Sequence, residues 1–386
     1  MNPDGRVRAK TEQGKASSPL KKTGQSFTAR TNNLMAWYDH ARRTLPWRSE
    51  PGEIPDPYHV WLSEVMLQQT TVATVTPRFR MFLSRWPTVT ALAAASLDEV
   101  LHEWQGLGYY ARARNLHRCA VTVSCDHGGV FPATEEGLRL LPGIGEYTAA
   151  AIAAIAFGQA SAPVDGNILR VVSRLDRLNT LLSDGRKEVA AAVASMVPAD
   201  RPGDFVQAMM DLGAMICSPR KPGCDDCPWG GDCEAHAHGQ QEAFPVKKAK
   251  QEKPTRYGVI YWLEDHLGRV LLRRRPEKGL LGGMMEFPST EWCEGLGAGS
   301  GAAEVVAEHP FASIKPCLHW RPVDGGIRHT FTHFHLELSV VSVRLNEGDP
   351  VPATNGIWCR PEEFNEHALP TVMKKVAAHA LNPTEP

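Results

Sequence analysis

The feature that most constrains this chain is a group of four cysteines spaced Cys-x6-Cys-x2-Cys-x5-Cys. We expect a reducing compartment, because the N-terminus has no apolar run typical of a secretory signal, and cysteines seldom form disulfides there. Four thiolates so close in sequence converge easily on one metal site, which zinc or a [4Fe–4S] cluster could fill. Zinc knuckles usually have separated Cys-x2-Cys pairs and this chain has a single such pair, so the spacing favours the cluster. The predicted ligands are Cys217, Cys224, Cys227 and Cys233.

Length and composition indicate a folded protein of more than one domain. A chain of 386 residues is longer than one hydrophobic core usually organises, and its 42% hydrophobic and 22% charged residues are close to the average of soluble globular proteins. The formal net charge of −1 argues against an overall attraction to nucleic acid or membrane, although local patches remain open. The long uncharged stretch from Thr148 to Val164 is rich in alanine and contains Gly158 and Pro163, so we predict no membrane span.

Changes of composition divide the chain into successive parts. Residues 1–30 carry seven Lys or Arg against two acidic residues, which predicts a disordered basic tail, either a plain solvated extension or a loose phosphate-binding arm. Residues 31–235 have helical apolar spacing, and residues 236–256 have the lysine- and proline-containing composition of a linker. Residues 257–382 combine strand-like and helical patterns. The predicted fold is therefore multidomain, an all-α domain followed by an α+β domain.

The apolar spacing also predicts individual elements. Helices are expected near residues 32–43, 58–84, 96–104, 110–125, 134–141, 146–157, 166–178, 186–196, 203–216, 300–308 and 370–380. Strands are expected at 257–263, 270–272, 329–344 and 356–359.

A glycine-rich turn, Leu141-Pro142-Gly143-Ile144-Gly145, lies between two of the helical patterns. Such a turn leaves backbone N–H groups free at the start of the following helix, where they can bind a phosphate. Gly143 and Gly145 are therefore candidate phosphate-binding residues, and a plain helix-to-helix connection is the alternative. The turn follows a helix rather than a strand, which excludes the dinucleotide-binding fingerprint.

Two carboxylates stand in unlike surroundings. Glu64 lies in the apolar stretch Val60 to Leu67, where it is either a functional acid or a buried partner of Arg48 or another cation. Asp165 precedes Gly166-Asn167 and is a natural helix N-cap, where the helix dipole favours the anion. Taken together, a desolvated acid that donates a proton and a carboxylate that stabilises a sugar cation are what cleavage of a glycosidic bond requires.

Aromatic and amide side chains suggest contact with nucleic acid. Gly106-Leu107-Gly108-Tyr109-Tyr110 frames a tyrosine that could enter a base stack, with Arg112 and Arg114 nearby. Gln68 and Gln69 follow the glutamate helix, and such amides can fill the gap left by an extruded base or bind base edges. Helix capping and core packing are the alternatives.

In their order and spacing these motifs resemble the MutY adenine DNA glycosylases of the helix-hairpin-helix superfamily, over roughly residues 31–380. The resemblance implies removal of adenine opposite 8-oxoguanine or guanine in duplex DNA, a [4Fe–4S] cluster on the four cysteines, and a monomer without membrane contact. It implies that Glu64 is the general acid, that Asp165 stabilises the oxocarbenium ion, and that Asn167 orients the pair. Further positions that match the family line the adenine pocket or lie beside the opposite base: Tyr147, Arg48, Leu67, Gln207, Gln69 and Tyr109.

The C-terminal part resembles the MutT-like domain that these glycosylases carry. The resemblance implies that Phe331, Thr332 and His333 contact 8-oxoguanine, with Thr332 standing where many relatives have serine. The sequence after Gly279 and Glu286 lacks the acidic run with which Nudix hydrolases bind magnesium, so hydrolase activity of this domain is disfavoured.

Tyr147 stands where the related endonuclease III-like enzymes carry a lysine nucleophile, so we expect a glycosylase with at most weak strand-cleaving activity. An endonuclease III-like enzyme for oxidised pyrimidines and a DNA-binding protein without catalysis remain the alternatives. A bacterial, cytoplasmic location is expected, with downstream repair proteins as a further class of partner. One departure from the family pattern is a longer segment, Ser49 to Asp56, before the glutamate helix.

Overall fold

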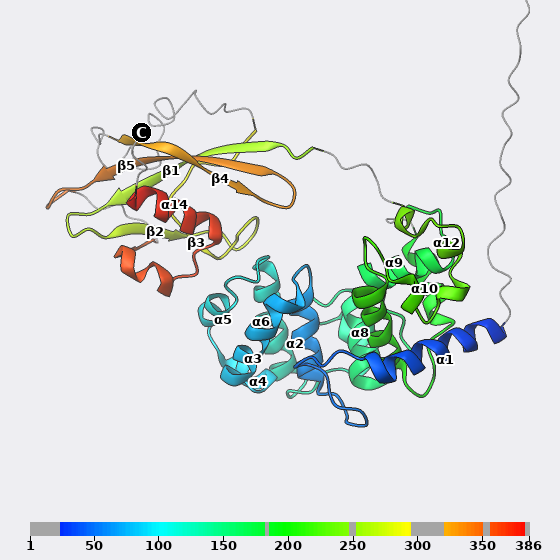
Figure 1. Cartoon of the computed structure of the whole chain (residues 1–386). Helices are drawn as coiled ribbons and strands as arrows, with labels where there is room; N and C mark the ends of the chain where they lie inside the picture. The colour runs from blue at the N-terminus through cyan, green and yellow to red at the C-terminus, as the bar shows by residue number, and fades with distance from the viewer. Residues whose placement is uncertain (1–23, 182–184, 247–251, 295–319, 350–355, 383–386) are drawn as a thin grey trace, which may run out of the picture.

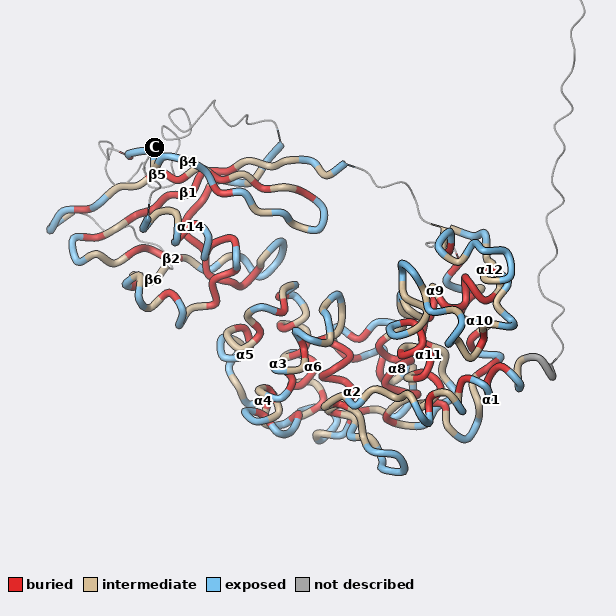
Figure 2. Tube along the Cα trace, viewed as in Figure 1, coloured by how far each residue is buried: buried red, intermediate tan, exposed pale blue. Residues whose placement is uncertain are grey.

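A computed structural model describes residues 24–181, 185–246, 252–294, 320–349 and 356–382 of the chain. The helical part comes first and consists of two lobes, and a part built on a β-sheet follows (Figure 1). Each lobe and the sheet have their own buried apolar clusters, which appear as separate red zones in Figure 2. The multidomain architecture predicted from the sequence is confirmed.

The first lobe is built around the indole and phenyl rings of Trp61, Phe79, Phe82 and Trp104, all fully buried. Hydroxyl side chains cap several of its helices, and Ser96 forms a full capping box with Glu99. Its helices are α2 (Pro57–Leu67), α3 (Val72–Arg85), α4 (Val89–Ala94), α5 (Leu97–Glu103), α6 (Ala111–Asp126), α7 (Glu135–Arg139) and α8 (Glu146–Phe157).

The second lobe combines the first described helix with those after α8. Its core packs Leu34 and Tyr38 against Phe205 and Trp229. Its elements are α1 (Gly24–Ala41), α9 (Gly166–Leu175), α10 (Arg186–Ala194), α11 (Pro202–Asp211), the π-helical turn η1 (Leu212–Ile216), α12 (Glu234–Ala237) and the 3-10 turns η2 (Cys224–Asp226), η3 (Gly230–Asp232) and η4 (Gln241–Ala243).

The helix expected at 58–84 is in fact two helices. The backbone of Gln69 adopts φ 57°, which no α-helix contains, and the Thr71 side chain caps the start of α3. Glutamine and threonine do not interrupt apolar periodicity, so the sequence did not show this break. The short helix α4 was also not predicted.

Parts of the segments expected as tail and linker are folded. Helix α1 begins at Gly24, and the expectation of disorder up to residue 30 is wrong there, because Arg30 is buried and pairs with Asp176 at 3.2 Å. Residues 236–246 also pack on the second lobe, where Arg174 Nε donates to the carbonyl of the buried Phe244. Neither contact can be predicted from local composition, because each joins residues that are far apart in the sequence.

The C-terminal part is a mixed sheet with the order β3-β2-β1-β5-β4, and β6 also pairs with β2. The central pair, β1 and β5, is parallel from Thr255–His335 to Glu264–Arg344. The segment expected as one strand over 329–344 is a hairpin that turns at residues 331–334. The elements are β1 (Thr255–Glu264), β2 (Val270–Arg274), β3 (Met285–Glu286), β4 (Arg321–Thr330), β5 (His335–Arg344), β6 (Gly356–Cys359), the 3-10 helix η6 (Pro361–Glu366) and α14 (Thr371–Leu381).

The helix expected at 300–308 lies outside the described residues. Within the described part of the chain, no helix has the length and apolar character needed to cross a membrane.

Candidate active site

Glu64 lies on the buried helix α2 and lines a pocket between the two lobes. Its neighbours on the helix, from Val60 to Met66, are all buried, and Glu64 itself is only 7% exposed. Burial raises the pKa of Glu64 to about 7, and the nearby Asp165 adds to this, whereas a hydrogen bond from Tyr147 and the charge of Arg48 act in the opposite sense. A glutamic acid in this pocket can therefore hold a proton near neutral pH.

The pocket contains about 420 Å³ of empty space, including the part open to solvent. The predicted pocket residues Arg48, Leu67 and Gln207 all line it together with Glu64. Further lining residues are Arg43, Leu45, Trp47, Val60, Ser63, Val72, Ile155 and Met210. A cavity with apolar walls and a few polar side chains is typical of a small-molecule or base pocket.

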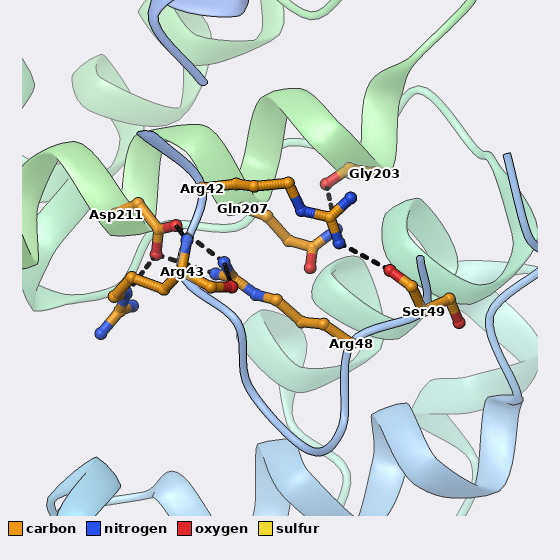
Figure 3. Close-up of polar contacts among 7 residues, drawn as sticks. All are labelled: Arg42, Arg43, Arg48, Ser49, Gly203, Gln207 and Asp211. Atoms are coloured by element: carbon orange, nitrogen blue, oxygen red, sulfur yellow. Dashed lines mark hydrogen bonds and ion pairs between the residues drawn. The ribbon is translucent and has the colours of Figure 1, made fainter. Parts of the chain in front are cut away.

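Asp211 at the end of α11 organises the arginines of the pocket (Figure 3). Arg48 donates to its carboxylate through both terminal nitrogens, at 2.7 and 2.8 Å, and Arg43 Nε donates at 2.6 Å. Burial raises the pKa of Asp211, but the two arginines outweigh this and hold it below its ordinary value. The cation Arg48 thus has Asp211 as its ion-pair partner, so the alternative that Glu64 is a structural partner of Arg48 is not supported.

Asp165 is the N-cap of α9, as the sequence indicated. One carboxylate oxygen accepts from the Ile168 amide at 2.6 Å and the other from Asn167 Nδ2 at 2.9 Å. The hydrogen bonds at the helix N-terminus lower the pKa of Asp165, as expected. Burial outweighs them, so the pKa of Asp165 is raised above its ordinary value. Asp165 acts electrostatically on both Glu64 and Tyr147, which places the three groups in one site.

Arg170, one turn along α9, connects this site to the first of the clustered cysteines. Its guanidinium donates to Asn167 Oδ1 at 2.9 Å, to the Gly213 carbonyl at 2.6 Å and to the Cys217 carbonyl at 2.8 Å. A Cβ atom on Gly213 would lie 2.6 Å from Cβ of Asn167, so only glycine permits this packing. The orientation of Asn167 therefore depends on the segment that leads into Cys217.

The four predicted ligands Cys217, Cys224, Cys227 and Cys233 line one cavity of about 300 Å³ of empty space, open in part to solvent. Arg174 closes one side and donates to Cys217 Sγ at 3.3 Å. Among the described residues, no group of three or more His, Cys, Asp or Glu is arranged so that it could hold a metal ion. Four thiols that line one cavity are nevertheless the donor set that thiolate-bound zinc or an iron–sulfur cluster requires.

The glycine-rich turn joins α7 to α8 as predicted. Gly143 has φ 76°, and a Cβ there would lie 2.6 Å from Cβ of Asn115, so the position requires glycine. Gly145 is the N-cap of α8, and no side chain caps the helix start there. Its exposed N–H groups remain available to an anion.

The predicted contacts to the opposite base come from two loops that Arg112 holds together. Its guanidinium donates to the carbonyls of Val65, Met66 and Leu107 at 2.9, 3.0 and 2.7 Å, and burial lowers its pKa to about 10. Arg112 is thus an internal brace between the two loops. Gln69 and Tyr109, on the braced loops, are exposed and adopt φ 57° and 48°.

Gln68 differs from Gln69, because its amide donates to Thr148 Oγ1 at 3.1 Å. It therefore joins α2 to α8 within the first lobe. Backbone conformations with positive φ are costly for residues other than glycine and often mark functional sites, and they occur at Gln69 and Tyr109 rather than at Gln68.

The sheet part meets the first lobe at this point. The Tyr109 hydroxyl and Thr332 Oγ1 form a hydrogen bond of 2.6 Å, and Arg274 pairs with Asp98 at 2.8 Å nearby. Thr332 and His333 are exposed. Phe331 instead stacks on Phe334, with ring centroids 4.8 Å apart, and contributes to the core of the sheet part.

Arg43 and Asp211 were not predicted from the sequence as residues of the site. A signal for Asp211 was present, because it stands in the apolar run Met209-Met210-Asp211-Leu212, the same kind of setting that drew attention to Glu64. Its partners on the loop after α1 could not be identified without the fold.

Comparisons with known proteins identify the class of this protein. A model of the HhH-GPD superfamily of base excision DNA repair proteins matches residues 62–199, and a NUDIX domain model matches residues 259–379. A solved thermostable thymine-DNA glycosylase has 28% sequence identity and a TM-score of 0.51, and the match covers 56% of this chain and 99% of that one. The helical part has the fold of a base excision repair glycosylase.

The curated relatives show which family of DNA glycosylases the chain belongs to. The human adenine DNA glycosylase is 37% identical, over 90% of this chain and 73% of the human protein. The adenine DNA glycosylase of Mycolicibacterium smegmatis is 41% identical, over 55% of this chain and 70% of that protein. The chain belongs to the adenine DNA glycosylase family. The expectation of an adenine-specific DNA N-glycosylase of base excision repair is thereby confirmed.

Proposed function

We propose that Glu64 protonates adenine in the pocket and that Asp165 stabilises the sugar cation left when the glycosidic bond breaks. The observation that carries this proposal is the pairing of a buried glutamic acid, whose pKa is about 7, with a carboxylate held by an amide and Asn167. Protonation turns the base into a neutral leaving group, and a nearby anion in a water-poor site stabilises the developing positive charge.

Tyr147 supports the acid rather than acting as a nucleophile. Its hydroxyl bonds to Glu64, and burial raises the pKa of Tyr147 well above its ordinary value, so the phenol stays neutral. A neutral phenol cannot form the Schiff base on which strand cleavage by lysine depends. We therefore propose a glycosylase that releases the base and leaves the strand intact.

Arg48, Leu67 and Gln207 line the space that we assign to adenine. Leu67 offers an apolar wall, and Gln207, whose Nε2 donates to Gly203 at 3.2 Å, has an amide oxygen that can accept a hydrogen bond from an amino group (Figure 3). Flipping a base out of the duplex costs a few kcal/mol, least at a mispair, and such contacts offset part of this cost.

We further propose that Gln69, Tyr109, Thr332 and His333 contact the base opposite adenine, 8-oxoguanine or guanine. The hydrogen bond between Tyr109 and Thr332 brings groups from both parts of the chain to one spot, which supports this assignment. Phe331 holds the loop in place by packing and is a support rather than a contact residue. The N–H groups at Gly143 and Gly145 bind a backbone phosphate of the DNA.

A [4Fe–4S] cluster on Cys217, Cys224, Cys227 and Cys233 fits the cavity that these thiols line. When bound, the cluster would supply four metal–thiolate bonds that fix the loop between α11 and α12. Arg174 and Arg170 hold the same loop from α9, and Arg170 also orients Asn167 beside Asp165.

The deciding experiment replaces Glu64 by Gln and measures base release from duplexes with adenine opposite 8-oxoguanine or guanine. Base release should fall to background, while DNA affinity stays near that of the native protein. Glu136→Gln, at an exposed position on α7, is the matched control and should keep full activity. Turnover by Glu64→Gln at more than a small fraction of the native rate would refute the assignment.

A further inference from the structure

Behind the arginines that line the pocket is a buried carboxylate that the roles above do not use, that of Asp211. Asp211 is completely buried at the end of α11, and its side chain binds the Arg43 backbone amide at 3.1 Å besides the two guanidinium groups. A carboxylate with no exposed surface that is bound to two arginines is a costly arrangement, because each charge must leave water. Such an arrangement calls for a specific purpose.

Arg48 has two carboxylates within its electrostatic reach. Its side chain is 6% exposed and lines the pocket beside Glu64, and its charge acts on both Glu64 and Asp211. In the structure the paired geometry, with two nearly parallel N–H···O bonds, is to Asp211. Figure 3 shows Arg48 and Arg43 directed at Asp211 from the loop that follows α1.

We propose that Asp211 is a positioning residue for the reaction: by holding the Arg48 guanidinium on α11, it keeps this cation from pairing with Glu64 in the same pocket. A glutamate paired with arginine is ionised and cannot donate a proton. Asp211 does not touch the substrate in this scheme and acts through Arg48. The inference rests on the proposed role of Glu64 as the acid.

The other charged and titratable groups around Glu64 do not replace Asp211 in this role. Tyr147 of α8 bonds to Glu64, and Asp165 at the start of α9 acts on it electrostatically. Arg43, which lines the same pocket, is bound to Asp211 as well. Removing the negative charge of Asp211 would therefore free two cations on the side of the pocket that faces Glu64.

The test is the pH profile of single-turnover adenine excision by native protein, Asp211→Asn and Asp204→Asn. Asp204 lies on the same helix, but it pairs with Arg201 and does not line the pocket of Glu64, so it is the matched control. In the native protein the rate should fall above about pH 7 as Glu64 ionises. In Asp211→Asn this fall should begin about one pH unit lower, so that the rate is near native at acid pH and roughly tenfold lower at pH 8.

The outcomes distinguish a failure of the acid role of Glu64 from a failure of the positioning role of Asp211. A native profile without the fall would overturn the acid role of Glu64 and this inference with it. A native profile with the fall and an Asp211→Asn profile that is only scaled down at every pH would overturn this inference alone. In that case Asp211 would be structural.

A second comparison covers the case in which Asp211→Asn does not fold with an unpaired buried arginine. The triple variant Asp211→Asn/Arg43→Gln/Arg48→Gln removes all three charges and is compared with Arg43→Gln/Arg48→Gln, because Arg43 is also bound to Asp211. If Asp211 acts on Glu64 only through Arg48, the two profiles coincide along the pH axis. A displacement of about one unit between them would show a direct effect of Asp211 and overturn the inference.

Discussion

Glu64→Gln should make the protein more stable at alkaline pH although it removes the proposed proton donor. In the folded protein the pKa of Glu64 is about 7, against an ordinary value of 4.5 that we take for the unfolded chain. At pH values between these two pKa values, the folded state binds more protons than the unfolded state. The contribution of Glu64 to stability is therefore fully present below the pKa of the unfolded chain and is lost as the pH rises through the pKa of the folded protein. A displacement of this size corresponds to about 3 kcal/mol.

Glutamine has no charge to desolvate and does not show this loss. The difference in unfolding free energy between Glu64→Gln and native protein should therefore move by about 3 kcal/mol in favour of the variant between about pH 4 and pH 8. Urea titrations followed by far-UV circular dichroism, which reports mainly on the helical part, measure it at each pH. Glu136→Gln should give a nearly constant difference. If the difference for Glu64→Gln is just as constant, Glu64 is not desolvated in the folded protein, and its assignment as the acid loses its physical basis.

Three further outcomes are expected. Tyr109→Phe and Thr332→Val should each reduce the preference for adenine opposite 8-oxoguanine over guanine, and the double variant should lose little more than either single one, because the two side chains share one hydrogen bond; additive losses in excision kinetics would show independent contacts. Gly213→Ala should lower the unfolding free energy by about 1–3 kcal/mol and slow excision, because the added Cβ would displace Asn167. Unchanged excision kinetics would contradict the proposal that Asn167 positions Asp165. Cys224→Ser should lose the absorbance at ~400 nm expected of the proposed iron–sulfur cluster, together with DNA affinity, and survival of both would remove Cys224 from the proposed ligand set.

The sequence was most informative where chemistry and local structure coincide. The apolar run around Glu64 indicated a buried acid, Asp165 before Gly166-Asn167 indicated an N-cap, and both occur in the structure. The pairing of Arg48 with Asp211, 163 positions apart, depends on how α11 packs against α1 and the loop after it, and no spacing rule reveals such a pair. Local patterns therefore identified the chemical groups, but not which cation each one meets.

The breaks between elements were less predictable for a related reason. The turn at Gln69 is held by Arg112, whose guanidinium binds carbonyls at the end of α2 and in the loop before α6. The apolar alternation continues on both sides of the hairpin between β4 and β5, so the strand pattern alone did not show the turn at residues 331–334. In both places long-range contacts impose a bend that local residue preferences do not require.

In the proposed mechanism, the Asp165 side chain both starts helix α9 as its N-cap and faces the reacting sugar. Asparagine at this position would keep an oxygen for the Ile168 amide while losing the negative charge, and it is among the best capping residues. Alanine would lose both. The protein thus offers a way to stop catalysis without disturbing its shape, and Asp165→Asn is the natural choice for capturing the enzyme on intact, uncleaved DNA.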